Sequence, residues 1–470
     1  MLRCLHADCR QSSDGFDSGN PADFCSDDFF SPVPTLMNLR TLFSRCPRFP
    51  AHVIATLVAA ALVTARSSEG ADLPWPQFRG PGGQGHSTAT NLPTRWNETE
   101  NVAWKTSLPG EGWSSPVLGL GGIWLTAAST DGLSLRALCV DPSSGKLLHD
   151  VEVVHRSEPL PKNTKNSFAS PTPVVDERCV YVHFGTQGTA CLDQATAKVL
   201  WTNQELQLDH KEGPGSSPIL WNDLLIITCD GMDVQYVAAL DKNTGKLRWK
   251  TDRSGPPADN PDHRKAYTTP LVITVDGKEQ LISPGADRVI AYEPATGREL
   301  WKVEYKGFSI VPRPVLAHDL LYITTAFARP ELWAIRTGGT GDVTESHVAW
   351  KLKKQVPSSP SSLVVGKELY LISDKGILTV LDAVSGEELY TERIGGNFSA
   401  SPLYADGKVF LFREDGLCYV LKPGRSYELL QENQMEGRIL ATPAALGHAM
   451  FLRTDGALYR IEKPTASASR

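Results

Sequence analysis

The 470-residue sequence has few cysteines, and none has the spacing that would give it a defined role. No two cysteines are adjacent, and no CxxC or CxxCH motif occurs, which excludes paired zinc ligands, haem attachment and a vicinal disulfide. Cysteines scattered along apolar segments are most often small buried hydrophobic residues. Five lie in the body of the chain: Cys139, Cys179, Cys191, Cys229 and Cys418.

An excess of positive charge is also missing. The formal net charge is −6, so there is no electrostatic reason to expect a nucleic acid or an anionic membrane as partner. No GxSxG, Walker, HExxH or kinase motif occurs in a supporting context. The glycine-rich GPGGQG at 80–85 precedes any strand–helix unit, so we interpret it as part of an extended arm and not as a phosphate-binding loop.

The chain lacks an apolar run long enough to span a bilayer as a helix. The longest stretch, at 52–65, has about 14 residues where about 20 are needed. Arg40, Arg45 and Arg48 precede this stretch and Val63-x-Ala65 ends it, which is the pattern of a secretory signal. A buried or anchoring helix is the alternative interpretation. No cysteine follows closely, so we expect no lipoprotein anchor.

This pattern sets the expected organisation of the N-terminus. Residues 1–36 are interpreted as a non-native or disordered leader, with translation starting at Met37, and residues 37–71 as signal peptide and linker. Cleavage near Ala65 or Ala71 would place the mature protein in the periplasm or outside the cell, without a transmembrane segment.

What the sequence does contain is a recurring phrase with an acidic residue, a glycine and a tryptophan at fixed spacing. LDKNTGKLRW ends at Trp249, LDQATAKVLW at Trp201 and YEPATGRELW at Trp301. The acidic side chain of Asp241 is suited to accept hydrogen bonds from the amides of a tight turn. Gly245 supplies the positive φ of such a turn. We therefore expect a hairpin whose tryptophan packs against a neighbouring sheet and has a structural role.

A second phrase precedes each of these hairpins: a small hydroxyl residue, a proline, a short apolar segment and then an alternating strand. It recurs eight times at intervals of about 40–57 residues, which predicts eight four-stranded units. The proline positions are Pro116, Pro173, Pro218, Pro270, Pro314, Ser362 (replacing proline), Pro402 and Pro443.

The eighth unit has no outer strand of its own. The segment NVAWKTSLPG at 101–110 carries Trp104 in the aromatic position and is expected to complete that unit, which closes a ring and removes exposed sheet edges. The predicted fold is all-β: an eight-bladed β-propeller over 102–463, with an arm at 72–101 and a tail at 464–470. We expect Trp75 and Phe78 of the arm to pack on the rim.

The repeated (A/V)LDxxTGKxxW phrase resembles the repeat of pyrroloquinoline-quinone (PQQ)-type propellers over about 102–463. WPQFRGPGGQG at 75–85 resembles the N-terminal arm of secreted bacterial members. The family includes quinoprotein alcohol dehydrogenases and the non-enzymatic lipoprotein of the outer-membrane barrel-assembly machinery. The dehydrogenases hold a quinone between a tryptophan and two adjacent cysteines, and they bind calcium through Glu, Asn and Asp. Resemblance to the dehydrogenases would imply the same site in this chain. This chain lacks adjacent cysteines, and only 156–170 and 252–267 extend a blade junction, so it looks more like the non-enzymatic members.

Residues just before each first strand should gather around one mouth of the central channel, where propellers usually bind. Aromatic and cationic groups there could hold a peptide, a glycan or an anionic small molecule, or could simply be solvated. His210 and His263 could also join a metal site, but no third ligand is identifiable, and we predict none. The candidates are Trp113, Phe168, His210, Lys211, His263, Arg264, Tyr267, Arg313 and Phe398, with Lys265 and Phe308 in the same stretches.

We therefore expect a non-catalytic, monomeric scaffold without a cofactor that binds a protein or an envelope polymer. Two alternatives stay open. One is a dehydrogenase or sensor that binds PQQ with calcium. The other is an outer-membrane assembly factor, although the lipidation cysteine of the resembling lipoprotein is lacking.

Overall fold

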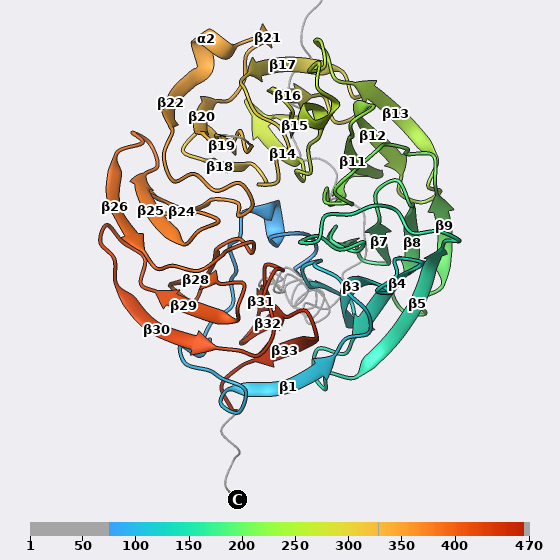
Figure 1. Ribbon diagram of the computed structural model, residues 1–470, viewed down its shortest axis with the longest axis vertical. Coiled ribbons are helices and arrows are strands. Elements are labelled where there is room, and N and C mark those ends of the chain that lie inside the picture. The colour runs from blue at the N-terminus through green and yellow to red at the C-terminus, as the bar shows by residue number, and fades with distance from the viewer. Residues whose placement is uncertain (1–74, 328, 465–470) are drawn as a thin grey trace, which may run out of the picture. The chain divides into compact units, whose positions relative to one another are not determined.

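The computed structural model describes residues 75–327 and 329–464. The chain divides into two compact units, 1–69 and 70–470, and the described residues all belong to the second. The predicted leader, signal peptide and linker at 1–71 lie outside them, as does all but the first residue of the tail. The second unit is a ring of eight radial sheets (Figure 1), which confirms the predicted eight-bladed propeller.

Each blade is built on an antiparallel sheet of four strands, the first nearest the axis. The strands of blades 1 to 3 are β2 (Val117–Gly119), β3 (Gly122–Ala128), β4 (Ser134–Val140) and β5 (Leu147–His155); β6 (Val174–Val175), β7 (Cys179–His183), β8 (Thr189–Asp193) and β9 (Val199–Asn203); and β10 (Ile219–Trp221), β11 (Leu224–Asp230), β12 (Gln235–Asp241) and β13 (Leu247–Asp252).

Blades 4 and 5 differ by an insertion, because the long loop of blade 5 adds a short parallel strand to the edge of blade 4. Their strands are β14 (Leu271–Val275), β15 (Lys278–Gly285), β16 (Arg288–Tyr292) and β17 (Glu299–Glu304) with the added β21 (Gly341–Asp342); and β18 (Val315–Ala317), β19 (Leu320–Thr324), β20 (Leu332–Arg336) and β22 (Val348–Leu352). The described helices are single turns: η1 (Pro81–Gly83), η2 (Pro261–Arg264) and α2 (Thr344–His347).

The last blade is completed by the first strand of the propeller, as predicted. β1 lies antiparallel to β33, with Trp104 opposite Arg460 and Thr106 opposite Leu458. Blades 6 to 8 are β23 (Leu363–Val365), β24 (Glu368–Ile372), β25 (Ile377–Asp382) and β26 (Glu388–Arg393); β27 (Leu403–Ala405), β28 (Lys408–Phe412), β29 (Leu417–Leu421) and β30 (Leu429–Gln434); and β31 (Ala444–Leu446), β32 (Ala449–Arg453), β33 (Ala457–Ile461) and β1 (Val102–Ser107).

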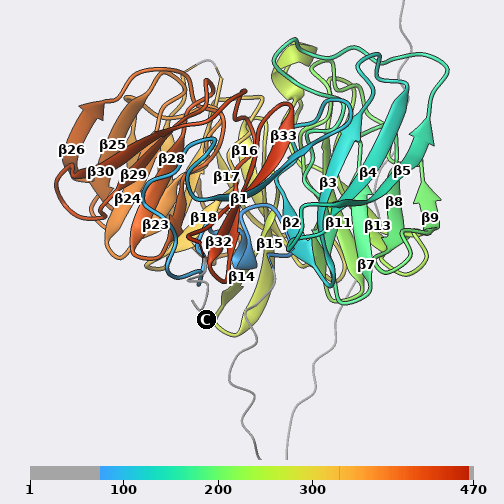
Figure 2. The same cartoon turned by 90° about the horizontal axis from the view of Figure 1, so that it is seen from below.

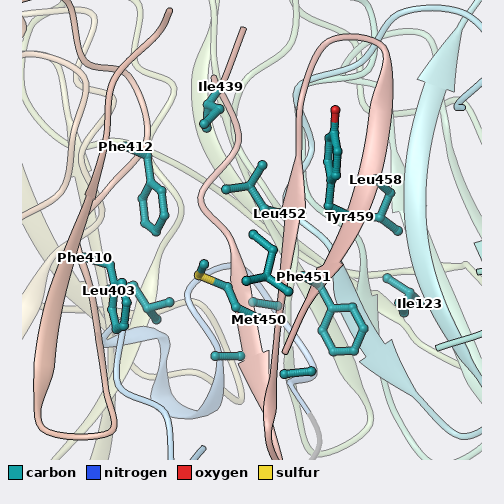
Figure 3. Packing of buried hydrophobic residues seen from close by; sticks show 14 of the residues in the cluster. Ile123, Leu403, Phe410, Phe412, Ile439, Met450, Phe451, Leu452, Leu458 and Tyr459 are labelled. Atoms are coloured by element: carbon teal, nitrogen blue, oxygen red, sulfur yellow. The ribbon is translucent and has the colours of Figure 1, made fainter. Parts of the chain in front are cut away.

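The hydrophobic core lies between blades. Figure 3 shows Met450 and Phe451 of β32 between Phe410 of β28 on one side and Ile123 of β3 on the other, so one blade fills the space between its two neighbours. Alternate residues of a strand point to opposite faces, and each blade is therefore apolar on both. The free cysteines Cys139, Cys179, Cys191, Cys229 and Cys418 are all buried, which confirms their interpretation as core residues.

The repeated tryptophan phrase joins each blade to the next. The Trp201 indole N–H donates to the Lys242 carbonyl at 2.9 Å, and Trp249 donates to Pro294 in the same way at 3.1 Å. A Cβ added to Gly245 would lie 2.5 Å from Cε3 of Trp201. The phrase needs glycine both for its positive φ of 72° and because the neighbouring indole lies on it.

The hydroxyl residue before each proline also has a structural role. The backbone N–H at this position in one blade donates to the Ser or Thr hydroxyl at the same position in the next, which links adjacent blades around the channel. Six such bonds of 2.9–3.2 Å occur: Ser115 to Thr172, Thr172 to Ser217, Ser217 to Thr269, Arg313 to Ser361, Ser361 to Ser401 and Ser401 to Thr442.

The N-terminal arm enters the centre of the ring, and this corrects the expectation that it packs on the rim. The Leu118 and Val175 amides of the innermost strands donate to the Trp75 and Pro76 carbonyls. The Trp75 side chain is 1% exposed. In Figure 1 the blue η1 lies near the axis. The arm then runs outward beneath blades 7 and 8, where Trp96 packs near Phe410, and leads into β1.

Candidate functional site

Three long connections cover one end of the ring: 156–173, 204–218 and 253–270, which we call the mouth face. Each precedes the first strand of blade 2, 3 or 4. In Figure 2, η2 of the third connection lies at the upper edge of the ring, while the blue η1 of the arm lies lower, toward the opposite end. The arm and the mouth face therefore occupy opposite ends of the channel.

The first connection crosses the channel. The Lys165 ammonium lies 2.7 Å from the Glu414 carboxylate of blade 7, and the Lys165 carbonyl accepts the indole N–H of Trp113 at 3.1 Å. On its other side, the Asn166 side chain donates to the carbonyls of Glu212 and Pro214. The connection is thus held on both sides, and the channel has the arm at one end and this segment at the other.

His210 is held in one tautomer at the mouth face. Its Nε2 accepts the Thr186 amide N–H at 2.9 Å, which leaves the ring proton on Nδ1. Burial lowers the pKa of His210 to about 4, so the imidazole is neutral at pH 7. The Tyr267 hydroxyl donates to the His210 carbonyl at 2.9 Å and fixes the backbone beneath it.

Lys211 belongs to an ion network that joins the second and third connections. Its ammonium lies 2.6 Å from Asp262 Oδ1, and Asp262 also accepts from the buried Lys265 at 3.0 Å. Lys265 in turn lies 3.5 Å from Glu212. The hydrogen bonds from Lys211 and Lys265 lower the pKa of Asp262 to about 2, so the carboxylate is ionised under ordinary conditions.

An aromatic cluster continues the mouth face toward blade 5. The His263 ring stacks on Phe308 with centroids 4.1 Å apart, and Phe327 follows at 6.2 Å from Phe308. The Phe327 side chain is 50% exposed and leaves apolar surface beside the mouth face.

The remaining predicted residues serve the fold. Arg313 is 3% exposed and donates to the Phe78 and Pro270 carbonyls and to the Gln77 side chain, so it anchors the arm instead of facing the mouth. Phe398 is fully buried between blades 6 and 7. Arg264 donates to the Ala258 and Asp259 carbonyls and closes its own loop. Trp113 holds the first connection, with Arg438 over its ring at 5.9 Å.

A cavity of about 390 Å³ lies where the first two connections meet the β7–β8 hairpin. Phe168, His210 and Lys211 line it, so the structure brings three of the nine predicted residues together there. Sequence reasoning missed its other polar residues. Thr186 and Gln187 belong to the β7–β8 hairpin, and the others lie in the two connections but were not singled out. The missed residues are Arg156, Thr186, Gln187, Gln204, Gln207 and Asp209.

Within 75–327 and 329–464, no group of three or more His, Cys, Asp or Glu side chains is placed to hold a metal ion. This leaves the two-histidine metal hypothesis without a third ligand among those residues. The cysteines lie apart on buried strands, and the crossing segment around Lys165 covers the channel.

A family model described as outer membrane protein assembly factor BamB matches residues 94–340 and 342–468, most of the chain. The chain belongs to this family. BamB of Moraxella catarrhalis is 14% identical with a TM-score of 0.53, and the match covers 77% of this chain and 99% of that one. No sequence among curated proteins matches the chain.

The family fold is shared with enzymes. Quinohemoprotein alcohol dehydrogenase from Comamonas testosteroni is 13% identical with a TM-score of 0.60, covering 88% of this chain and 85% of that one. A second such dehydrogenase, from Pseudomonas putida HK5, is 11% identical with a TM-score of 0.54, covering 85% and 82%. At these identities the likeness establishes the fold alone.

None of the helices in the described part of the chain has the length and apolar character needed to cross a bilayer.

Proposed function

We propose that this protein is a non-catalytic scaffold of the periplasm or cell surface that binds a protein partner through its mouth face. The observation that carries the proposal is that the chain itself occupies both ends of the channel: Arg313 holds the arm at one end, and the Lys165–Glu414 pair holds the crossing segment at the other. Recognition is then left to the outer surface of the three connections.

The chemistry of that surface supports a binding role. Charged side chains of this surface form ion pairs with one another, such as Lys211 with Asp262. These pairs hold the second and third connections together. The aromatic cluster of His263, Phe308 and Phe327 adds apolar area, and aromatic residues are enriched where proteins bind one another. Membership of the BamB family, whose described role is outer membrane protein assembly, agrees with a protein partner.

A photo-crosslinking amino acid placed at two exposed positions tests the proposal. Phe327 lies at the mouth face and is 50% exposed, whereas Leu120 lies in the β2–β3 hairpin at the other end of blade 1 and is 68% exposed. In the producing cell we expect a crosslinked protein band from position 327 and none from position 120. Equal crosslinking at both positions, or crosslinking of position 327 to a glycan polymer alone, contradicts the proposal.

The quinone alternative has a separate test. Titration of the purified chain with PQQ and calcium, followed by tryptophan fluorescence, is expected to give no saturable quenching at micromolar quinone. Saturable quenching together with quinone-dependent alcohol oxidation would replace the scaffold proposal.

A further inference from the structure

The cavity between the first two connections and the β7–β8 hairpin combines an apolar part with side-chain amides. Leu160, Phe168 and Leu208 supply apolar surface, and Gln187, Gln204 and Gln207 supply amide groups. A volume of about 390 Å³ is within the range of sites that hold small ligands or short peptide segments.

His210 lines this cavity and has a hydrogen-bond donor that the described residues do not use. Because Nε2 accepts the Thr186 amide N–H at 2.9 Å, the neutral ring carries its proton on Nδ1. Nδ1 makes no hydrogen bond with any residue of 75–327 or 329–464. The hydrogen bond from Thr186 to Nε2 therefore fixes the ring on the β7–β8 hairpin, and Nδ1 is left as a hydrogen-bond donor.

Gln187 also lines the cavity and has an acceptor without a partner. The residue is 1% exposed, and its buried Oε1 has no hydrogen-bond partner in the described part of the chain. A buried acceptor without a partner costs free energy, and native proteins rarely leave one without a compensating group. The neighbouring Gln207 differs, because its amide donates to the Thr186 and Gln204 carbonyls.

We propose that this cavity binds an extended peptide segment of the partner protein. A main-chain carbonyl of the segment accepts the proton of His210 Nδ1, and a main-chain N–H donates to Gln187 Oε1. An aliphatic side chain of the segment packs against Leu160 and Pro161. The inference rests on the proposed function and specifies its partner chemistry.

A peptide fits these groups better than an N-acetylated sugar, which carries the same amide. Sugars are bound with the face of an exposed aromatic ring, and the aromatic side chain of this cavity, Phe168, is only 5% exposed. Leu208 is likewise only 7% exposed, so the apolar surface left for a ligand comes from the aliphatic Leu160 and Pro161, which suits leucine or valine.

Saturation-transfer NMR with the blocked tripeptide Ac-Ala-Leu-Ala-NH2 and the full-length chain tests the inference. We expect transfer to the leucine methyl groups in the wild type and at least a tenfold weaker affinity in both His210→Gln and Gln187→Leu. Glutamine at 210 retains an acceptor near the position of Nε2 for the Thr186 amide but removes the Nδ1 donor. Gln187→Leu keeps the size and removes the amide.

Matched controls are His448→Gln and Gln431→Leu, which make the same replacements on blade 8 and on the outer strand of blade 7 and should bind like the wild type. Equal thermal unfolding of all variants shows that folding is retained. The inference is overturned if the tripeptide gives no transfer, if both site variants bind like the controls, or if N-acetylglucosamine binds and the tripeptide does not.

The two proposals fail in distinguishable ways. A protein crosslinked from position 327 together with no tripeptide binding removes the peptide inference and leaves the scaffold proposal standing. The absence of any crosslinked protein removes the scaffold proposal whatever the tripeptide does.

Discussion

Replacing Gly245 by alanine tests how neighbouring blades are joined. The residue has a φ of 72°, and a Cβ there would lie 2.5 Å from Cε3 of Trp201. The left-handed backbone alone costs an alanine about 1–2 kcal/mol. Displacing the indole, whose N–H is bonded to the Lys242 carbonyl, adds about 1–3 kcal/mol of overpacking. We expect Gly245→Ala to lower the free energy of unfolding by about 2–5 kcal/mol.

The chain provides a matched control in Gly277, at the tip of the β14–β15 hairpin. Its φ is 73°, and nothing lies within 4 Å of an added Cβ. Gly277→Ala should therefore show only the backbone cost of about 1–2 kcal/mol.

Urea titrations of Gly245→Ala and Gly277→Ala, and of Trp201→Ala with and without Gly245→Ala, measure the free energies of unfolding. In the Trp201→Ala background the indole contact is gone, and the cost of alanine at 245 should fall to the cost at 277. Equal destabilisation by Gly245→Ala and Gly277→Ala in the wild-type background would refute the role assigned to the glycine–tryptophan contact.

Three further outcomes follow from buried ionisable side chains. Arg313→Ala removes three hydrogen bonds to the arm and to Pro270, and we expect about 2–4 kcal/mol of destabilisation and faster proteolysis near residue 78; unchanged proteolysis would contradict the anchoring role. Asp230→Asn leaves the buried Arg253 guanidinium without its 2.8 Å carboxylate partner and should cost about 3–5 kcal/mol in urea unfolding. Burial lowers the pKa of His183 to about 3, so the unfolded chain takes up a proton near pH 6.5 that the folded chain refuses; this residue should contribute about 2 kcal/mol to the fall in stability between pH 7.5 and pH 5, and His183→Gln should reduce the fall by that amount while leaving the contribution of His210.

The architecture was predictable because the contacts that build a blade lie close in sequence and recur. The turn of Asp241 and Gly245 is a local arrangement, and its tryptophan meets the equivalent turn of the next blade about 45 residues away. The closing strand could also be predicted, because the eighth unit lacked its outer strand and Trp104 supplied the missing pattern.

The candidate site was predicted only in part. Position before a first strand indicated which end of the ring a residue would reach, and this held for His210 and Lys211. It could not distinguish exposed side chains from buried ones, and Arg313 and Phe398 turned out to be buried. Gln187 carried no signal, because a glutamine in a hairpin is ordinary until the surrounding loops bury it.

The amino-acid sequence alone determined the number of blades, the content of each blade and the way the ring closes, because these depend on short-range patterns repeated along the chain. The tertiary structure decided where the arm lies and which mouth residues meet around a cavity. Those contacts join segments far apart in sequence, such as Arg313 with Phe78 across 235 positions, and no local pattern specifies how long connections fold over a channel.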